Sequence, residues 1–272
     1  MSFIALFATV LLCGPSPLDA YGASADYTLT TVAYGTIGRQ RLDVYAPNAR
    51  AENTQRAVVV FFYGGGWEIG SRERYRFVGK ALTEAGFVAV VPDYRVYPEA
   101  VFPDFIRDCA KAVAWTKKHI DRFGGDPARI FVMGHSAGAH IAAMIALDPQ
   151  YLRNEGMTRA ELRGVIGLAG PYDFLPIAPG KLEFIFGSEA ERWRSQPINF
   201  ADGANPPMLL LTGDRDSVVP PGNTRRLAAK IRANQGPVVA IEFAGMDHAE
   251  VLNALASRGD LLRTLTSFIR QH

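Results

Sequence analysis

The sequence predicts an α/β fold: a mostly parallel eight-stranded sheet with helices on both faces and a small cap inserted late in the chain. Apolar, β-branched runs of strand length alternate with longer segments of helical spacing, as in buried parallel strands joined by crossover helices. Several runs end in glycine-rich or polar turns, where ligand sites of such sheets form. With 272 residues, 48% hydrophobic and 21% charged, the chain has enough apolar material for one such domain.

The expected strands differ between the start of the chain and the rest. The first two alternate polar and apolar residues and predict an antiparallel hairpin, whereas the later strands are mostly continuous apolar runs, typical of buried parallel strands. The expected positions are 27–34, 41–45, 57–62, 88–91, 129–133, 164–168, 208–212 and 238–243.

Helices are expected between these strands, without internal repeats or low-complexity segments. Amphipathic or small-residue patterns predict helices at 74–85, 104–119 and 137–147, and two strand–helix units at 207–234 and 238–270. Residues 171–205 are rich in proline, phenylalanine and tryptophan and have little regular period. We expect this segment to be a small cap insertion above the ligand site.

Gly134-His135-Ser136-Ala137-Gly138 is the most informative motif in the chain. It stands between a predicted buried strand and a helix of small and apolar residues, so its serine lies in a sharp turn with the form of a nucleophile elbow. The flanking glycines suit a strained turn whose helix passes close to the strand. The serine hydroxyl would be exposed there, with the helix N-terminus beneath any negative charge that develops.

A serine nucleophile needs a base, and after such an elbow the acid and then the base follow along the chain. The histidines are His119, His135, His140, His248 and His272. His119 and His135 precede the serine in the chain. His272 is the last residue, where fraying is common. His140 lies one turn along the serine's own helix and is predicted to be a buried helix histidine. This leaves His248, in a predicted loop after the last strand, as the base.

Two aspartates compete to orient that base. Both follow the predicted strand 208–212, in Gly213-Asp214-Arg215-Asp216. Asp214 stands nearer the strand end, where aspartates commonly hold turns through the backbone. Asp216 projects further and is followed by an apolar pair that can anchor the loop. We expect Asp216 to bind Nδ1 of His248, with Asp214 as the alternative.

The segment Tyr63-Gly64-Gly65-Gly66-Trp67 follows another buried strand. Three consecutive glycines let backbone N–H groups turn toward a ligand without interference from Cβ atoms. The N–H of Ala137 would add a donor from the elbow itself. We therefore expect an oxyanion hole here.

Together these segments resemble the α/β-hydrolase superfamily, and within it the hormone-sensitive-lipase-like esterases and their bacterial carboxylesterase and feruloyl-esterase-type relatives. The resemblance covers about residues 27–270. Besides the elbow, it rests on the glycine loop and on Asp93-Tyr94-Arg95-Val96-Tyr97-Pro98-Glu99, Phe123-Gly124-Gly125-Asp126-Pro127, Gly213-Asp214-Arg215-Asp216 and Asp247-His248.

The resemblance implies a role for each matching residue. Ser136 is the nucleophile, Asp216 the orienting acid and His248 the base. The second and third glycines of the loop, Gly65 and Gly66, supply the oxyanion hole. No cofactor or metal is implied.

One position departs from the pattern of the family. Its glycine loop usually begins with a histidine that ties the loop to neighbouring backbone, and this chain has Tyr63 there. A tyrosine hydroxyl can make an equivalent bond or can itself face the oxyanion, and the sequence leaves both open. We take Tyr63 and Trp67 as candidate substrate-pocket residues.

The predicted function is hydrolysis of small-molecule carboxylic esters through an acyl-enzyme on Ser136. A cap as short as 171–205 favours short acyl groups, because it cannot roof a long acyl channel. An arylformamidase-type amidase is the alternative reaction, since Gly65-Gly66-Trp67 is similar to the loop of that group. A non-catalytic hydrolase-fold binding protein is the alternative of another class, although such proteins usually lose a triad member and all three are present here.

Charge and cysteine content exclude other classes. A net charge of +2 gives no electrostatic reason to expect nucleic acid as a partner. The two cysteines, Cys13 and Cys109, fall in a leader-like segment and a predicted helix, so we expect neither an internal disulfide nor a metal site.

The N-terminal segment predicts export. Residues 3–13 form an unbroken apolar run that is too short to span a membrane and suits the core of a signal peptide. Ala23-Ser24-Ala25 offers a cleavage site of small residues. We expect residues 1–25 to be a signal peptide, and residues 26–272 to be a periplasmic or secreted hydrolase domain without a membrane span. A lipid anchor on Cys13 is less favoured, because Leu12 before it is not small.

Overall fold

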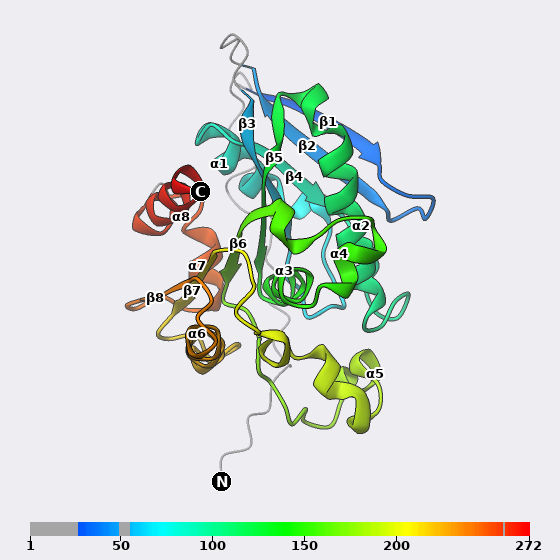
Figure 1. The fold of residues 1–272 in the computed structure, drawn as a ribbon, viewed down its shortest axis with the longest axis vertical. Coiled ribbons are helices and arrows are strands. Elements are labelled where there is room, and N and C mark those ends of the chain that lie inside the picture. Colours follow the sequence, from blue (N-terminus) through cyan, green and yellow to red (C-terminus); the bar gives the residue numbers. More distant parts are fainter. Residues whose placement is uncertain (1–26, 49–54, 258) are drawn as a thin grey trace.

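The structure is a computed structural model that describes residues 27–48, 55–257 and 259–272 (Figure 1). The predicted signal peptide, residues 1–25, lies outside the described residues, so its cleavage and the export of the chain stay predictions.

Eight strands of the described residues form one sheet in the order β1-β2-β4-β3-β5-β6-β7-β8. Strand β2 pairs antiparallel with both β1 and β4, and every later pair is parallel. The predicted mostly parallel eight-stranded sheet is therefore confirmed. The strands are β1 Tyr27–Ala33, β2 Arg41–Pro47, β3 Arg56–Phe62, β4 Val88–Pro92, β5 Gly125–His135, β6 Leu162–Leu168, β7 Met208–Gly213 and β8 Val238–Phe243.

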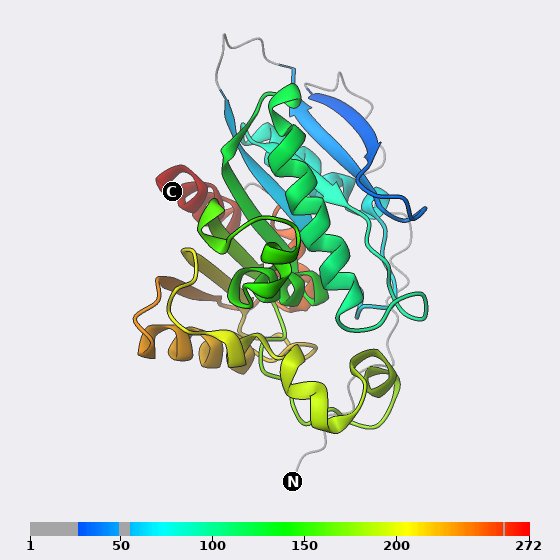
Figure 2. The same cartoon turned by 45° about the vertical axis from the view of Figure 1, so that its right-hand side comes forward.

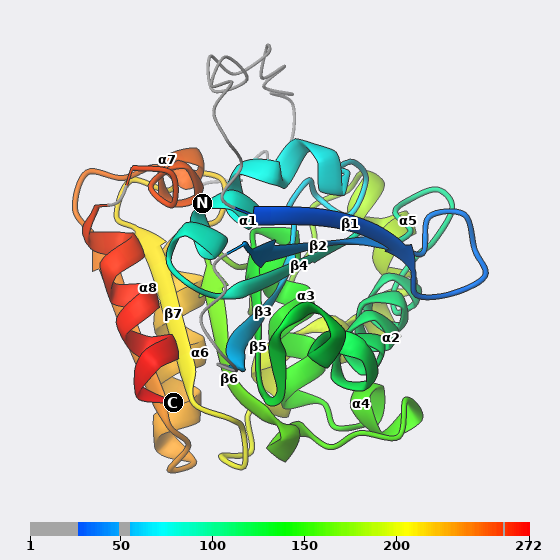
Figure 3. The same ribbon diagram turned by 90° about the horizontal axis from the view of Figure 1, so that it is seen from above.

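Helices cover both faces of the sheet, as Figure 3 shows from above. Helices α1 and α8 share one face, where Arg270 donates to the main-chain oxygen of Ala85 at the end of α1. Helices α2, α3 and α6 lie on the other face. The helices are α1 Arg76–Glu84, α2 Asp104–His119, α3 Ala137–Leu147, α4 Gln150–Asn154, α5 Lys181–Phe186, α6 Gly222–Ala233, α7 His248–Asn253 and α8 Asp260–Gln271.

The central strands are buried because helices cover them on both sides. Nearly every residue of β3, β4 and β7 is buried, which explains why these segments are apolar runs with no alternation. Strand β5 is longer than the expected 129–133, since it begins at Gly125, and it ends directly before Ser136. The centre of the sheet therefore holds the elbow rigidly.

The predicted cap lies between β6 and β7, at the end of the molecule where the parallel strands end (Figures 1 and 2). It is more regular than its sequence suggests, with α5 and two 3₁₀ segments at Glu189–Ser195 and Pro197–Phe200. Its backbone is attached to the body at several points. The Asn223 side chain of α6 accepts from the N–H groups of Tyr172 and Asp173, at 3.0 and 2.9 Å.

The end of the chain differs from the expected single helix after the last strand. Two helices follow β8, and the first of them, α7, begins at His248. No helix in the described part of the chain combines the length and apolar character needed to cross a membrane.

Candidate active site

Ser136 lies in the turn between β5 and α3 with a backbone that few residues adopt, φ 54° and ψ −123°. The tightness of the turn explains both flanking glycines. A Cβ on Gly134 would lie 2.1 Å from the oxygen of Gly138, and a Cβ on Gly138 would lie 2.0 Å from the oxygen of Phe62. Any larger residue would force the helix away from the sheet. The structure thus has the nucleophile elbow that the motif predicts, with Ser136 itself half-buried.

His248, at the start of α7, and Asp216, in the loop after β7, form a close pair. Nδ1 of His248 lies 2.7 Å from Oδ2 of Asp216. The other carboxylate oxygen accepts from the backbone N–H groups of Val218 and Val219, at 3.0 and 2.8 Å. The Asp216 side chain is wholly buried, whereas that of His248 is 16% exposed. The pair thus has the geometry of an orienting acid and a base that reaches solvent.

Asp214, the alternative acid, lies elsewhere. It is exposed, and its carboxylate accepts from the backbone N–H of Gly245 at 2.7 Å. It therefore braces the turn that leads to His248, and the structure brings Asp216 rather than Asp214 to the imidazole.

The expected loop position of His248 is wrong, because this residue begins helix α7. Asp247 caps the helix by accepting from the N–H groups of Ala249 and Glu250, at 2.9 and 2.8 Å. The Glu250 carboxylate accepts in return from the N–H of Asp247 at 2.8 Å. This reciprocal capping box gives the base a defined backbone rather than a mobile one.

The glycine loop lies directly against the elbow. A Cβ on Gly64 would stand 3.0 Å from Cβ of Ser136. Gly65 and Gly66 adopt positive φ angles of 120° and 62°, which favour glycine. In the part of the chain that the structure describes, no hydrogen-bond acceptor occupies the N–H groups of Gly65, Gly66 or Ala137. Three unused backbone donors beside the serine can stabilise an oxyanion.

Tyr63 is not a pocket residue, which corrects the expectation from the sequence. Its side chain is fully buried, and its hydroxyl donates to Oδ1 of Asp93 at 3.0 Å and accepts from Arg39 at 3.3 Å. Burial, and then the negative charge of Asp93, raise the pKa of Tyr63 well above its usual value, so the hydroxyl keeps its proton. Arg39 also donates to the oxygen of Gly70, at 2.5 Å. Of the two possibilities left open, the tyrosine makes the tethering bond.

Replacing Tyr63 with phenylalanine is expected to lower the free energy of unfolding by about 1–3 kcal/mol, because it removes two buried hydrogen bonds to charged groups, those to Asp93 and Arg39. The loop should also lose part of its rigidity. Chemical denaturation measures the first effect and steady-state kinetics the second. Tyr27→Phe is the matched control, since the Tyr27 hydroxyl has no hydrogen-bond partner among the described residues. Equal stability of the two variants would contradict the tethering role.

Trp67 closes the loop on the side of the cap. It is only 3% exposed, and its ring packs against Phe186, His140 and Phe174 at centroid distances of 4.8, 5.2 and 5.8 Å. It therefore forms part of an aromatic wall behind the oxyanion loop, where α3 meets the cap. Phe105 of α2 completes this wall.

The remaining histidines differ in their surroundings. His140 is buried as expected, and its Nε2 lies 2.7 Å from the oxygen of Ser195, joining α3 to the cap. Burial lowers its pKa to about 4. His135, for which the sequence predicts no role, is also buried, with Nε2 3.0 Å from the main-chain oxygen of His248. The sequence signal that could have identified His135 was a polar residue at the end of an otherwise apolar, buried strand.

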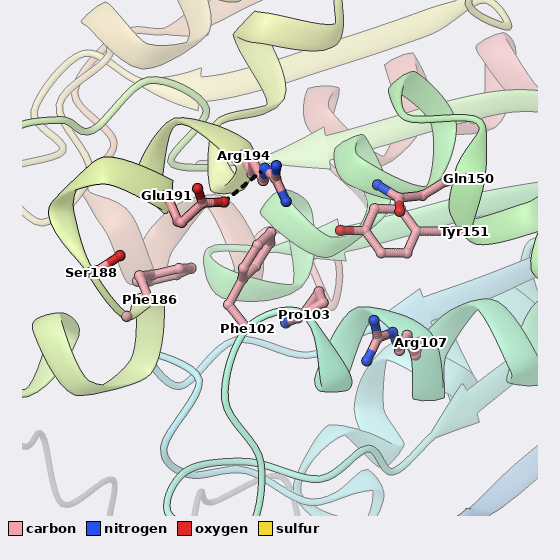
Figure 4. Close-up of a pocket in the computed structure, with 10 residues that line it drawn as sticks. Phe102, Pro103, Arg107, Gln150, Tyr151, Phe186, Ser188, Glu191 and Arg194 are labelled. Atoms are coloured by element: carbon pink, nitrogen blue, oxygen red, sulfur yellow. Dashed lines mark ion pairs between the residues drawn. The ribbon is translucent and has the colours of Figure 1, made fainter.

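A cavity of about 390 Å³ lies on the other side of the aromatic wall, between the cap and helices α2 and α4 (Figure 4). Phe186 borders it and also contacts Trp67, so this ring separates the cavity from the oxyanion loop. Arg194 over the cavity pairs with Glu191 at 2.9 Å. The lining residues are Phe102, Pro103, Arg107, Gln150, Tyr151, Phe186, Gly187, Ser188, Glu191 and Arg194.

The described residues contain no group of three or more histidine, cysteine or acidic side chains arranged to hold a metal ion. What the site presents is a half-buried hydroxyl in an elbow, an imidazole oriented by a buried carboxylate, and unused backbone donors. This combination suits nucleophilic acyl transfer.

Comparison with known proteins agrees with this geometry. The family model described as BD-FAE matches residues 42–231. Esterase LipC of Mycobacterium tuberculosis is 32% identical over 262 residues, which cover 88% of this chain and 64% of that protein. Isoprenylcysteine alpha-carbonyl methylesterase ICME of Arabidopsis thaliana is 28% identical over 242 residues, 81% of this chain and 56% of that protein. The chain thus spans roughly six tenths of the length of these relatives.

A solved structure shares the fold over nearly its whole length. The truncated form of a carbohydrate esterase from gut microbiota superposes with a TM-score of 0.78, covering 92% of this chain and 98% of that chain. The sequences are 22% identical, so this likeness concerns the fold. It confirms the predicted α/β-hydrolase architecture.

Proposed function

This chain belongs to the BD-FAE family of α/β-hydrolase-fold esterases, and we propose that it hydrolyses carboxylic esters through an acyl-enzyme on Ser136. The observation that carries the proposal is the 2.7 Å contact between His248 Nδ1 and the buried carboxylate of Asp216, combined with a strained serine elbow. Such an arrangement has little structural reason to exist unless the serine is activated.

The proposed reaction begins when the Ser136 oxygen attacks the ester carbonyl carbon while Nε2 of His248 accepts the serine proton. The carbonyl oxygen becomes an oxyanion, which the N–H groups of Gly65, Gly66 and Ala137 stabilise. When the carbon–oxygen bond to the alcohol breaks, His248 gives its proton to the departing alkoxide. Water then attacks the acyl-enzyme by the same steps and releases the carboxylic acid.

Asp216 stays ionised during both steps. It accepts a hydrogen bond from Nδ1–H of His248, so Nε2 is left unprotonated and can accept the serine proton. The carboxylate then stabilises the imidazolium that forms when His248 takes the proton. Two backbone N–H groups on the other carboxylate oxygen keep Asp216 in the required orientation.

We further propose that the preferred acyl groups are short. The space between the oxyanion loop, the first turn of α3 and the cap is filled by Trp67, Phe174 and Phe186, with Phe186 only 3% exposed. These large rings pack against one another at centroid distances of 4.8 to 5.8 Å and leave no room there for an extended chain. The cavity beyond Phe186 is cut off from the loop by the same ring.

A chain-length series of p-nitrophenyl esters is expected to give the highest kcat/KM between acetyl and hexanoyl. Phe186→Ala should shift the optimum toward longer chains, because it joins the oxyanion side to the cavity of about 390 Å³. Phe102→Ala, which enlarges the cavity without removing a ring packed on Trp67, is the matched control. An optimum at decanoyl or longer in the unmodified chain would overturn the short-acyl proposal.

Two further assays separate the alternatives from esterase activity. A fluorophosphonate probe should label Ser136, whereas a non-catalytic binding protein would stay unlabelled. N-Formylkynurenine tests the amidase alternative against acetylated xylan and feruloyl esters. Faster turnover of the formamide than of every ester would replace the esterase proposal with the amidase.

A further inference from the structure

His135 contacts two separate parts of the proposed site and directly precedes the third. It is the residue before Ser136, at the end of β5. Its Nε2 lies 3.0 Å from the main-chain oxygen of His248, and the two imidazole rings are 4.7 Å apart. Its Nδ1 borders the glycine loop, because a Cβ on Gly64 would stand 3.1 Å from that atom.

The hydrogen bond fixes the tautomer of His135. The partner of Nε2 is a carbonyl oxygen, which only accepts, so Nε2 carries the proton and donates. Nδ1 is then unprotonated, and it has no hydrogen-bond partner among the described residues. Burial, and then the charge of His248, lower the pKa of His135 to about 3. The ring is thus neutral, and within the described residues its only polar contact is the one to the backbone of the base.

We propose that His135 is a positioning residue for catalysis, whose Nε2–H holds the backbone of His248 at the start of α7 against the serine elbow. The inference rests on the function proposed above for Ser136 and His248. Asp216 holds only the Nδ1 side of the imidazole. The capping box joins residues at the start of α7 to one another and does not tie that helix to the strand. The bond from His135 ties the backbone of the base directly to the strand that carries the nucleophile.

The neutrality of His135 suits this role. During each proton transfer His248 becomes an imidazolium, and a second cation 4.7 Å away would oppose that charge. A buried neutral ring supplies the hydrogen bond without the charge. A lysine or arginine at the same position would supply the bond together with an opposing charge.

The test compares His135→Gln, His135→Asn and His135→Leu in the full-length chain. Glutamine places an amide N–H near the position of Nε2, asparagine places it nearer that of Nδ1, and leucine has no donor. We expect kcat on p-nitrophenyl butyrate to fall by about 10- to 100-fold in the leucine and asparagine variants with KM little changed, because the base is displaced rather than the substrate. Glutamine should restore most of kcat.

A second readout follows the base itself. The proton between Nδ1 of His248 and Asp216 gives a low-field NMR resonance, which should persist in the glutamine variant and broaden in the leucine variant. His119→Gln, at the end of α2, is the control for replacing a histidine elsewhere in the chain.

The outcomes separate this inference from the proposed function. A natural chain that neither hydrolyses esters nor reacts with a fluorophosphonate contradicts the function itself. An active natural chain with a leucine variant of unchanged kcat overturns the positioning role. If the leucine variant does not fold, equal kcat values for the glutamine and asparagine variants overturn it.

Discussion

Replacing Ser136 with alanine is expected to lower kcat/KM for p-nitrophenyl butyrate by about 10⁴-fold or more, the scale of losing a triad nucleophile. Alanine keeps the Cβ atom and tolerates the φ of 54° as serine does, so the elbow should not change. The loss therefore reports the missing hydroxyl rather than a distorted turn. Initial-rate kinetics measure the effect, and thermal unfolding shows whether the fold is intact.

Ser217→Ala is the matched control for this variant. Ser217 is an exposed serine on the loop that carries Asp216, so its loss tests whether any serine near the acid matters. The control should keep its activity and its labelling by a fluorophosphonate, whereas Ser136→Ala should lose both. A Ser136→Ala enzyme that keeps more than about a tenth of the natural activity would refute the assignment of the nucleophile.

The sheet and the elbow could be predicted because their causes are local. Strands covered on both faces must be apolar throughout, so β3 and β7 are visible as continuous runs. The contacts that exclude a side chain at Gly134 and Gly138 come from the turn itself and the neighbouring strand end. Sequence spacing alone therefore identified the turn that holds Ser136.

Contacts between residues far apart in the chain were not predictable in the same way. The direction of Tyr63 depends on Asp93 and Arg39, which meet it only after β2, β3 and β4 have paired. The contact of His135 with His248 joins residues 113 positions apart. The periodicity of a sequence carries no information on such long-range contacts. The partners of these polar residues could therefore not be predicted from the sequence.

The secondary structure of the cap could not be predicted either, because it also depends on contacts with distant parts of the chain. Its short helical segments have too few turns to produce a period, and tertiary contacts stabilise them. One of these is the bond from His140 to Ser195, and another is the packing of Phe186 against Trp67. The position and the aromatic content of the cap were therefore predictable from the sequence, but its short helices were not.

Asp216→Asn is expected to reduce kcat by about 10⁴-fold, and Asp214→Asn to leave it close to that of the natural chain. One oxygen of Asp216 accepts from the N–H groups of Val218 and Val219. An asparagine must present its amide oxygen to those donors, so its NH₂ group then faces Nδ1 of His248. Nδ1 can only accept from NH₂, which moves the imidazole proton to Nε2 and leaves no base for Ser136.

The Asp214 variant is the control because it makes the same chemical change two residues away. The Asp214 carboxylate accepts from the N–H of Gly245, and an amide oxygen accepts that bond equally well. Steady-state kinetics of both variants, with thermal unfolding to check the fold, measure the difference. If the ranking is reversed, the acid is Asp214. If both variants turn over like the natural chain, the buried carboxylate does not orient His248, because a proton on Nε2 cannot coexist with general-base catalysis by that atom.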